Sequence, residues 1–150
     1  MKELSQLIAD HPLFEGIPLE YTEALTSCAQ EGEYGEGSFL TLSGSSAETF
    51  FIILEGTVSI QVQPPHNSPI TILTLGEGDT LGWSWIFPPY AWHFDAHATS
   101  PTKVIAFDAE SVREKCDQDH ELGYKLMKRI AQVMLDRLVA TRLQLLDLYG

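Results

Sequence analysis

Short hydrophobic runs separated by glycine-bearing turns dominate the sequence from about residue 29 to residue 107. The runs are rich in β-branched and aromatic residues, which favour strands. They cover residues 39–42, 49–54, 57–62, 70–75 and 103–107. Many short strands at nearly regular spacing are typical of a barrel, roll or sandwich. Glu55-Gly56 predicts a tight hairpin between two of the runs, and the proline-rich stretch 64–69 predicts a looser one.

Helical patterns precede the strands. Apolar residues recur at helix spacing between residues 4 and 8. Proline disfavours helix in the residue before it, so His11-Pro12 predicts the end of this first helix. Pro18 suits the first turn of a second short helix.

The sequence becomes helical again after Asp108, which is suited to act as an N-cap. A short helix is expected to about Cys116. Asp117 or Asp119 then caps a long helix over about residues 119–148, and roughly 28 helical residues at about 1.5 Å each give a length of about 42 Å. One apolar stripe of this helix recurs at intervals of three and four, through Met127, Ile130, Met134, Leu138, Thr141, Leu145 and Leu148.

Further leucines and valines lie off this stripe, so the long helix is apolar on more than one side. Such a helix needs two surfaces to pack against. One is its own roll, and the other is most simply a second copy of the chain. We therefore expect a homodimer formed through the C-terminal helix.

Together these patterns predict one domain over residues 1–150. It has N-terminal helices over 1–28, a β-roll over 29–108 and C-terminal helices over 109–150. The expected fold class is mainly β with flanking α, a double-stranded β-helix or jelly-roll-like β-roll with a long C-terminal helix. A chain of 150 residues is long enough for one hydrophobic core.

The formal net charge of −12 argues against partners with negative surfaces. Nucleic acid binding needs a basic footprint, and anionic membranes attract basic segments. No Lys or Arg lies between Lys2 and Lys103. Cys28 and Cys116 are far apart in the sequence and form no CxxC pair, so we expect reduced thiols. With no signal peptide and no apolar run of membrane length, a cytoplasmic location is expected.

A set of glycines and hydrophobic residues follows a fixed order through the strand region. They are Tyr34, Gly35, Gly44, Ala47, Glu48, Thr49, Phe51, Ile52, Ile53, Leu54, Gly56, Val58, Leu75, Gly76, Gly78, Asp79, Leu81 and Gly82. In order and spacing they resemble the two glycine-turn hairpins of the cyclic nucleotide-binding domain of the catabolite activator protein family. The flanking helices match too. The resemblance implies a regulatory domain, and the DNA-reading helix-turn-helix of the family's transcription factors has no counterpart before Gly150.

The segment that holds the cyclic phosphate in this family departs from the family pattern. The resemblance implies a glutamate after Gly82, a short helix whose N-terminus faces the phosphate, and an arginine on the next strand. The glutamate position is Trp83, the arginine position is Trp92, and His93 follows it. Each lost charge-assisted contact costs roughly 1.5–3 kcal/mol, so two losses weaken binding by about two to four orders of magnitude. We therefore expect cAMP and cGMP to bind weakly or not at all.

All three tryptophans of the chain fall within this segment, so the remaining pocket is expected to be aromatic. Apolar walls with few polar groups suit a small molecule that has an apolar or aromatic body, either nucleotide-like or of another kind. The alternative is that the aromatic rings fill the old site and leave an empty scaffold. The candidate ligand-binding residues are Gly82, Trp83, Ser84, Trp85, Tyr90, Trp92 and His93.

Other chemistries find little support in the sequence. His93, Asp95 and His97 alternate along one strand face, but positions i and i+4 are about 13 Å apart, too far for one metal ion. No nucleophile elbow, P-loop or HExxH motif is present. We expect neither an enzyme nor a cofactor.

The sequence thus predicts a stand-alone sensor or regulatory module. Its phosphate-binding segment has diverged from the pattern that binds cyclic nucleotides. Two alternatives stay open. The first is a true cyclic nucleotide receptor in which His93 and backbone N–H groups replace the arginine. The second is a ligand-free scaffold that docks a protein partner.

Overall fold

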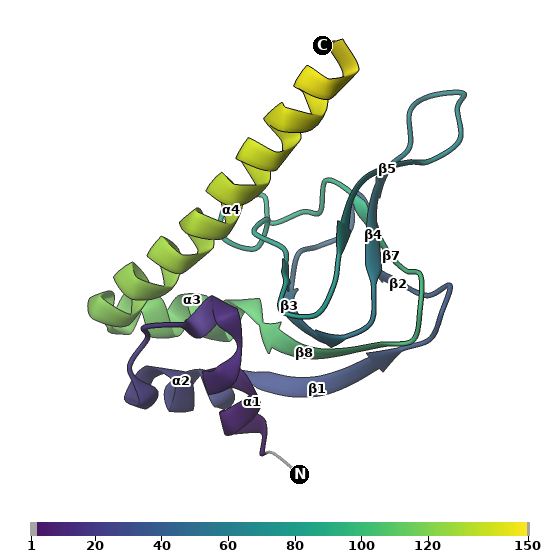
Figure 1. The fold of residues 1–150 in the computed structure, drawn as a ribbon. Coiled ribbons are helices and arrows are strands. Elements are labelled where there is room, and N and C mark those ends of the chain that lie inside the picture. The colour runs from purple at the N-terminus through teal and green to yellow at the C-terminus, as the bar shows by residue number, and fades with distance from the viewer. Residues whose placement is uncertain (1–2, 150) are drawn as a thin grey trace.

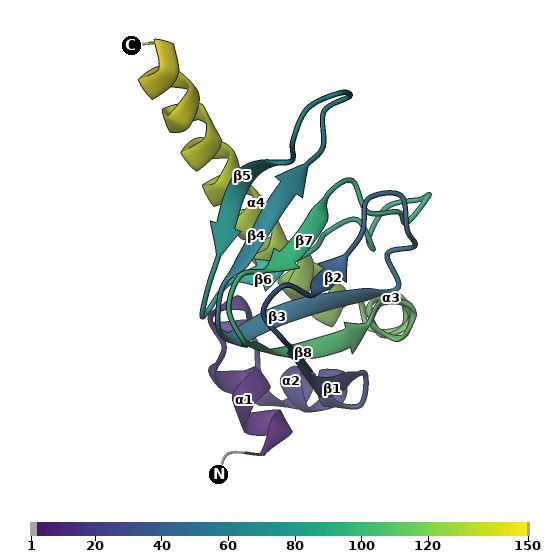
Figure 2. The same cartoon turned by 90° about the vertical axis from the view of Figure 1, so that its right-hand side faces the viewer.

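The computed structural model describes the backbone of residues 3–149 and the side chains of residues 3–140. Two four-stranded antiparallel sheets form the roll, one with the order β1-β8-β3-β6 and the other with the order β2-β7-β4-β5 (Figures 1 and 2). The strands are β1 Ala29–Tyr34, β2 Phe39–Thr41, β3 Thr49–Glu55, β4 Val58–Val62, β5 Ile70–Leu75, β6 Thr80–Leu81, β7 Asp95–Ala98 and β8 Thr102–Asp108. The predicted β-roll is confirmed.

Helices flank the roll at both ends of the chain. They are α1 Leu4–Asp10, the 3-10 turn η1 Pro12–Phe14, α2 Leu19–Thr26, α3 Ala109–Gln118 and α4 His120–Tyr149. The first helix ends before His11-Pro12, as predicted. Pro18 lies one residue before α2, as its N-cap, a shift within the ordinary uncertainty of helix ends. No helix in the described part of the chain combines the length and apolar character needed to cross a bilayer.

An aromatic stack crosses the core from the N-terminal helices to the segment after β6. Phe50 of β3 lies parallel to Phe107 of β8, with ring centroids 4.8 Å apart, and to Trp85, at 4.5 Å. Phe14 of η1 packs against the outer side of Phe107, at 5.8 Å. Since β3 lies between β8 and β6, this central strand fixes Trp85 against the core.

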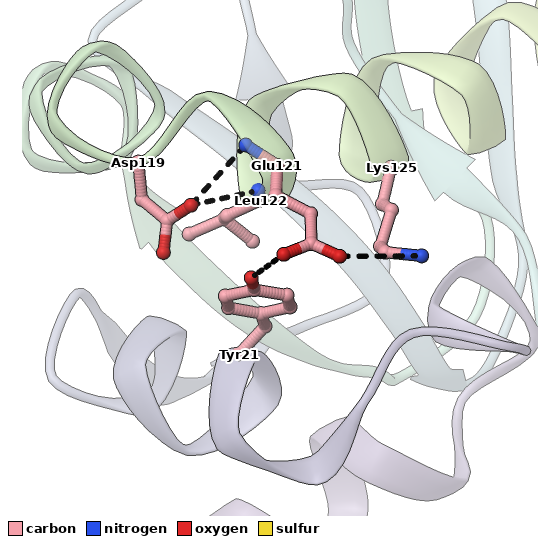
Figure 3. A network of polar contacts seen from close by, with 5 residues as sticks. All are labelled: Tyr21, Asp119, Glu121, Leu122 and Lys125. Carbon is pink, nitrogen blue, oxygen red and sulfur yellow. Dashed lines mark hydrogen bonds and ion pairs between the residues drawn. The ribbon is translucent and has the colours of Figure 1, made fainter.

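Three acidic residues and one arginine cap the C-terminal helices and hold them to the N-terminal helices. Asp108 caps α3 by accepting a hydrogen bond from the Ser111 N–H. Asp119 accepts hydrogen bonds from two N–H groups in the first turn of α4, and Glu121 accepts one from the Tyr21 hydroxyl of α2 at 2.7 Å (Figure 3). Further along α4, Arg129 donates to the carbonyl groups of Pro12 and Leu13. The start of α4 is therefore fixed to the N-terminal helices.

The second half of α4 extends past the roll (Figure 1). Within the predicted apolar stripe, Ile130 is buried, and Met127 and Met134 pack against the core. The first half of that stripe is thus covered by the chain's own core. Leu138 is 51% exposed, and Leu135 and Val139, predicted to lie off the stripe, are exposed beside it. The side chains of Thr141, Leu145 and Leu148 lie outside the described residues.

Candidate ligand-binding site

The segment from Gly82 to Phe94 joins β6 to β7 without forming a helix. One turn is closed by the Ile86 N–H, which donates to the Trp83 carbonyl at 3.1 Å. Further on, the backbone pairs with the loop before β3, where the Trp92 N–H donates to the Ser45 carbonyl at 2.9 Å. The short helix implied by the family resemblance is replaced by a turn. Residues 82–94 therefore present no helix N-terminus to a phosphate.

Trp92, at the family's arginine position, lies directly against Gly82. A Cβ atom added to Gly82 would lie 2.5 Å from Cη2 and 2.8 Å from Cζ3 of the indole. The φ angle of Gly82 is +106°, which side-chain-bearing residues rarely adopt. Trp92 is 5% exposed and packs on Phe94, with ring centroids 5.7 Å apart. The indole thus fills the space beside the glycine.

Trp85 belongs to the core. Its side chain is 1% exposed, stacks on Phe50, and donates from Nε1 to the Gly82 carbonyl at 3.2 Å. This ring anchors the segment and is not available to a ligand in this arrangement.

Trp83, at the family's glutamate position, is half-buried and forms the contact between the segment and α4. Its ring packs near Phe94, at 6.4 Å. The guanidinium carbon of Arg137 lies 5.3 Å from the Trp83 ring centroid, and the same guanidinium donates to the Thr80 carbonyl. Burial lowers the pKa of Arg137 from its ordinary value, and the charge of Asp79 opposes this shift. Arg137 of α4 therefore places a positive charge beside the segment 82–94, which itself contains no Lys or Arg.

Tyr90 is held in a similar way by α3. The guanidinium carbon of Arg113 lies 4.2 Å from the Tyr90 ring centroid, and Arg113 Nη1 donates to the Trp85 carbonyl at 2.6 Å. Arginine is suited to such sites, because its planar group stacks on rings while it donates hydrogen bonds.

The two polar candidates lie in different environments. His93 is exposed, whereas its neighbours Trp92 and Phe94 are buried. Ser84 is buried, and its Oγ has no hydrogen-bond partner among the described residues. Buried hydroxyl groups normally find a partner, so Ser84 is the polar group most in need of one.

The strand after Phe94 alternates as predicted, with Asp95 and His97 turned outward and Ala96 and Ala98 buried. Asp95 accepts a hydrogen bond from the Ser43 N–H at 2.8 Å, and His97 stacks on Phe39 at 4.7 Å. Within residues 3–140, no group of three His, Cys, Asp or Glu side chains is placed to hold a metal ion.

The fold thus brings together Gly82, Trp83 and Trp92, while Trp85 turns into the core, Tyr90 lies under Arg113 and His93 faces outward. The assignment of these residues to a ligand stays a prediction. Sequence reasoning missed Arg113 and Arg137 because it counted cations only within the strand region. The available signal was their place on helices that must pack against the roll.

Comparisons with known proteins agree with this fold. Residues 31–119 match the family model for the cyclic nucleotide-binding domain. The CRP-like cAMP-activated global transcriptional regulator of Mycobacterium tuberculosis is 23% identical over 145 residues, which are 97% of this chain and 63% of the regulator. This chain therefore spans less than two thirds of that relative.

Two solved structures share the fold. A putative cyclic nucleotide-binding protein from Geobacter metallireducens has a TM-score of 0.80 and 25% identity, over 92% of this chain and 99% of its own. A cyclic nucleotide-binding domain from Methylobacillus flagellatus has a TM-score of 0.81 and 19% identity, over 96% of this chain and 81% of its own.

Proposed function

Because the chain belongs to the cyclic nucleotide-binding domain family, we propose that it is a regulatory module of that fold whose site no longer takes cAMP or cGMP as its physiological ligand. One observation carries the proposal. The indole of Trp92 occupies the space against Gly82, at the position where the family's arginine would hold a phosphate.

The absence of both charged contacts found in the family determines how much affinity for cyclic nucleotides we expect this chain to lose. Trp92 replaces the arginine and Trp83 replaces the glutamate, and neither indole offers a charged partner to a phosphate or accepts a bond from a ribose hydroxyl. At roughly 1.5–3 kcal/mol for each charge-assisted contact, cyclic nucleotides lose about two to four orders of magnitude in affinity.

The charge of the roll acts in the same direction. Residues 29–102 contain eight Asp or Glu residues and no Lys or Arg. The summed field of such a surface repels an anion as it approaches.

A different small molecule with an apolar or aromatic body suits the site better. Trp83 and Tyr90 are half-buried, so each keeps part of its ring open to contact. Ser84 Oγ has no partner among the described residues and is the polar group that such a ligand would satisfy. Contact with Trp83 would reach α4 through Arg137, and a ligand that favours one helix position shifts the population toward it.

A second candidate is a cyclic nucleotide receptor with a reorganised cassette, and one observation favours it. The Arg137 guanidinium is already at the segment, beside Trp83. One of its nitrogens donates to the Thr80 carbonyl, so this bond would hold the guanidinium in place beside the segment. His93 is a weaker candidate for this role because it faces outward.

Pairing of two copies through α4 is part of the proposal. The exposed side chains of Leu135, Leu138 and Val139 support it, since a helix that extends past its roll leaves them uncovered. Sedimentation equilibrium tests this point. A dimer that Leu138→Glu converts to a monomer supports the pairing, and a wild-type monomer contradicts it.

Calorimetric titration with cAMP and cGMP tests the nucleotide side of the proposal. We compare the wild type with a Trp83→Glu/Trp92→Arg variant, which restores both family charges. The matched control is Trp83→Gln/Trp92→Gln, which removes the same rings without adding charge. We expect no micromolar binding by the wild type and a gain only in the charged variant, with thermal melting as the check on folding. Micromolar binding of either nucleotide by the wild type would overturn the proposal.

A thermal-shift screen of aromatic small molecules tests the remaining part. A stabilising compound whose effect is lost in Trp83→Leu supports a sensor of another ligand. No stabilisation by any compound contradicts the sensor and leaves the scaffold, which docks a partner through its helices.

A further inference from the structure

A groove lies where the N-terminal helices meet the roll, and no residue of the segment 82–94 lines it. Its volume is about 650 Å³, and its lining comes from α1, η1, β1, the end of β3, the turn between β5 and β6, and β8. We propose that this groove docks a short basic segment of a partner protein, in which Lys or Arg residues are mixed with apolar ones.

The floor of the groove presents apolar surface. Leu7 and Leu54 are half-buried and Pro12 is exposed, so each keeps part of its side chain accessible. Gly78 lies close to Pro12, since a Cβ added to it would be 3.5 Å from Cγ of the proline ring. The Gly78 N–H donates to the Ile53 carbonyl at 3.1 Å. These contacts fix the floor before a partner binds, which reduces the ordering that binding requires.

The rim of the groove is acidic. Four exposed carboxylate side chains line it, each from a different element: Asp10, Glu31, Glu55 and Glu77. One lysine is present among the lining residues, and this Lys103 pairs in register with Glu33 of β1 and Glu55 of β3. Its ammonium group forms an ion pair with Glu55 at 3.8 Å. The lining therefore holds four negative charges and one positive charge.

His11 also lines the groove, but it adds no positive charge at neutral pH. The side chain is buried, and burial lowers the pKa of its imidazole from the ordinary 6.5. A cleft lined mainly by one sign of charge raises the local concentration of the opposite sign. The groove therefore favours a basic partner and disfavours an acidic one.

The arrangement of the carboxylates favours a peptide over a small cation. They come from α1, β1, β3 and the turn between β5 and β6, so one small ion at the rim would meet few of them. Long Lys and Arg side chains can extend to an exposed rim while apolar neighbours in the same segment cover the floor. A segment with both kinds of side chain therefore uses the whole groove.

Fluorescence anisotropy with labelled peptides tests the proposal on the full chain. The probe is the peptide KLKLK. Two matched peptides are KGKGK, which keeps the charge, and QLQLQ, which keeps the leucines. We expect submillimolar, saturable binding of KLKLK at low salt, and binding about tenfold weaker for each matched peptide, because the groove offers both charge and apolar surface.

Two results of these titrations would overturn the proposal. One is the absence of saturable KLKLK binding. The other is equal binding of KGKGK, or of the polyamine spermidine, which would mean attraction to an acidic surface without use of the apolar floor.

Two variants with the same change in net charge locate the binding. Glu31→Gln/Glu77→Gln removes two carboxylates of the rim and should weaken KLKLK binding by about fivefold. Glu110→Gln/Glu114→Gln is the matched control, because both glutamates are exposed on α3 and do not line the groove, and it should leave binding nearly unchanged. Thermal melting checks that both variants are folded. Equal weakening by the two variants would contradict the assignment.

Sedimentation equilibrium distinguishes a partner protein from a second copy of this chain. Self-association that Glu31→Gln/Glu77→Gln abolishes would mean that the groove takes another copy, and it would overturn the proposal. An unchanged oligomeric state supports a partner of another kind. The inference does not depend on the proposed function, since a failure of KLKLK to bind leaves the cyclic nucleotide titrations unaffected.

Discussion

Replacing Gly82 with alanine tests the contact on which the proposed loss of phosphate binding depends. The added methyl group would lie 2.5 Å from Trp92 Cη2, at a backbone φ of +106°. The unfavourable backbone costs roughly 1–3 kcal/mol, and overpacking against a buried ring costs about 1–3 kcal/mol more. Gly82→Ala should therefore lose about 2–6 kcal/mol of unfolding free energy.

Gly37→Ala separates the two contributions. Gly37 has a φ of +92°, close to that of Gly82, but a Cβ added there would have nothing within 4 Å. This control variant meets the backbone cost alone. The excess cost at Gly82 then measures the contact with Trp92.

A double-mutant cycle with Trp92→Leu completes the test, with urea unfolding followed by far-UV circular dichroism. The smaller side chain removes the clash, so Gly82→Ala should cost less in this background, with a coupling of about 1–3 kcal/mol. The reasoning is refuted if Gly82→Ala costs no more than Gly37→Ala, or if its cost is the same with leucine at position 92.

Three further predictions concern other contacts. Arg137→Met should lower the free energy of unfolding by about 1–3 kcal/mol, because the charged hydrogen bond to Thr80 is lost; urea unfolding measures this, and the exposed Lys128→Met should change little. Burial lowers the pKa of His11 from its ordinary 6.5. The imidazole of His11 therefore binds a proton more tightly in the unfolded chain than in the folded chain. The free energy of unfolding is then highest above pH 6.5 and declines below it. The urea midpoint should vary less with pH in His11→Asn than in the wild type. Burial, followed by the charge of Asp117, raises the pKa of Cys116 to about 11 from 9.0; in a Cys28→Ala variant, its reaction with Ellman's reagent near pH 8 should be about a hundredfold slower than that of an unperturbed thiol.

The strands of the roll could be predicted from the sequence wherever local pattern and burial agree. β3 has four consecutive buried residues within a run of β-branched and aromatic side chains, and its bounds differ from prediction by one residue. β1 was not predicted, because its sequence AQEGEY is polar and contains glycine. Its conformation comes from pairing along its whole length with β8, about 70 residues later. Such pairing leaves no local signal.

The candidate site shows the same division. The positions of Trp83 and Trp92 relative to the family pattern could be read from the sequence, and so could the outward face of Asp95. The role of Trp85 could not, because only the stack on Phe50 distinguishes a core ring from a pocket ring. Arg137 could not be placed either, since it lies 54 residues beyond Trp83 and reaches it only through the docking of α4.

In the proposed sensor, the contacts of Arg129 and Arg137 would determine how a change in the segment from Gly82 to Phe94 is transmitted to α4. Arg129 holds the helix to η1 and Arg137 holds it to Thr80 and Trp83, eight residues and about 12 Å further along. The Arg129 contact does not involve the segment 82–94. A ligand that displaces Trp83 would therefore loosen only the Arg137 contact. The helix would then turn about Arg129, and the part of α4 beyond Arg137 would move furthest. A ligand that binds both helix positions equally well would shift neither, so the proposed sensing would require contact with Trp83 or Arg137 and not merely occupancy of the roll.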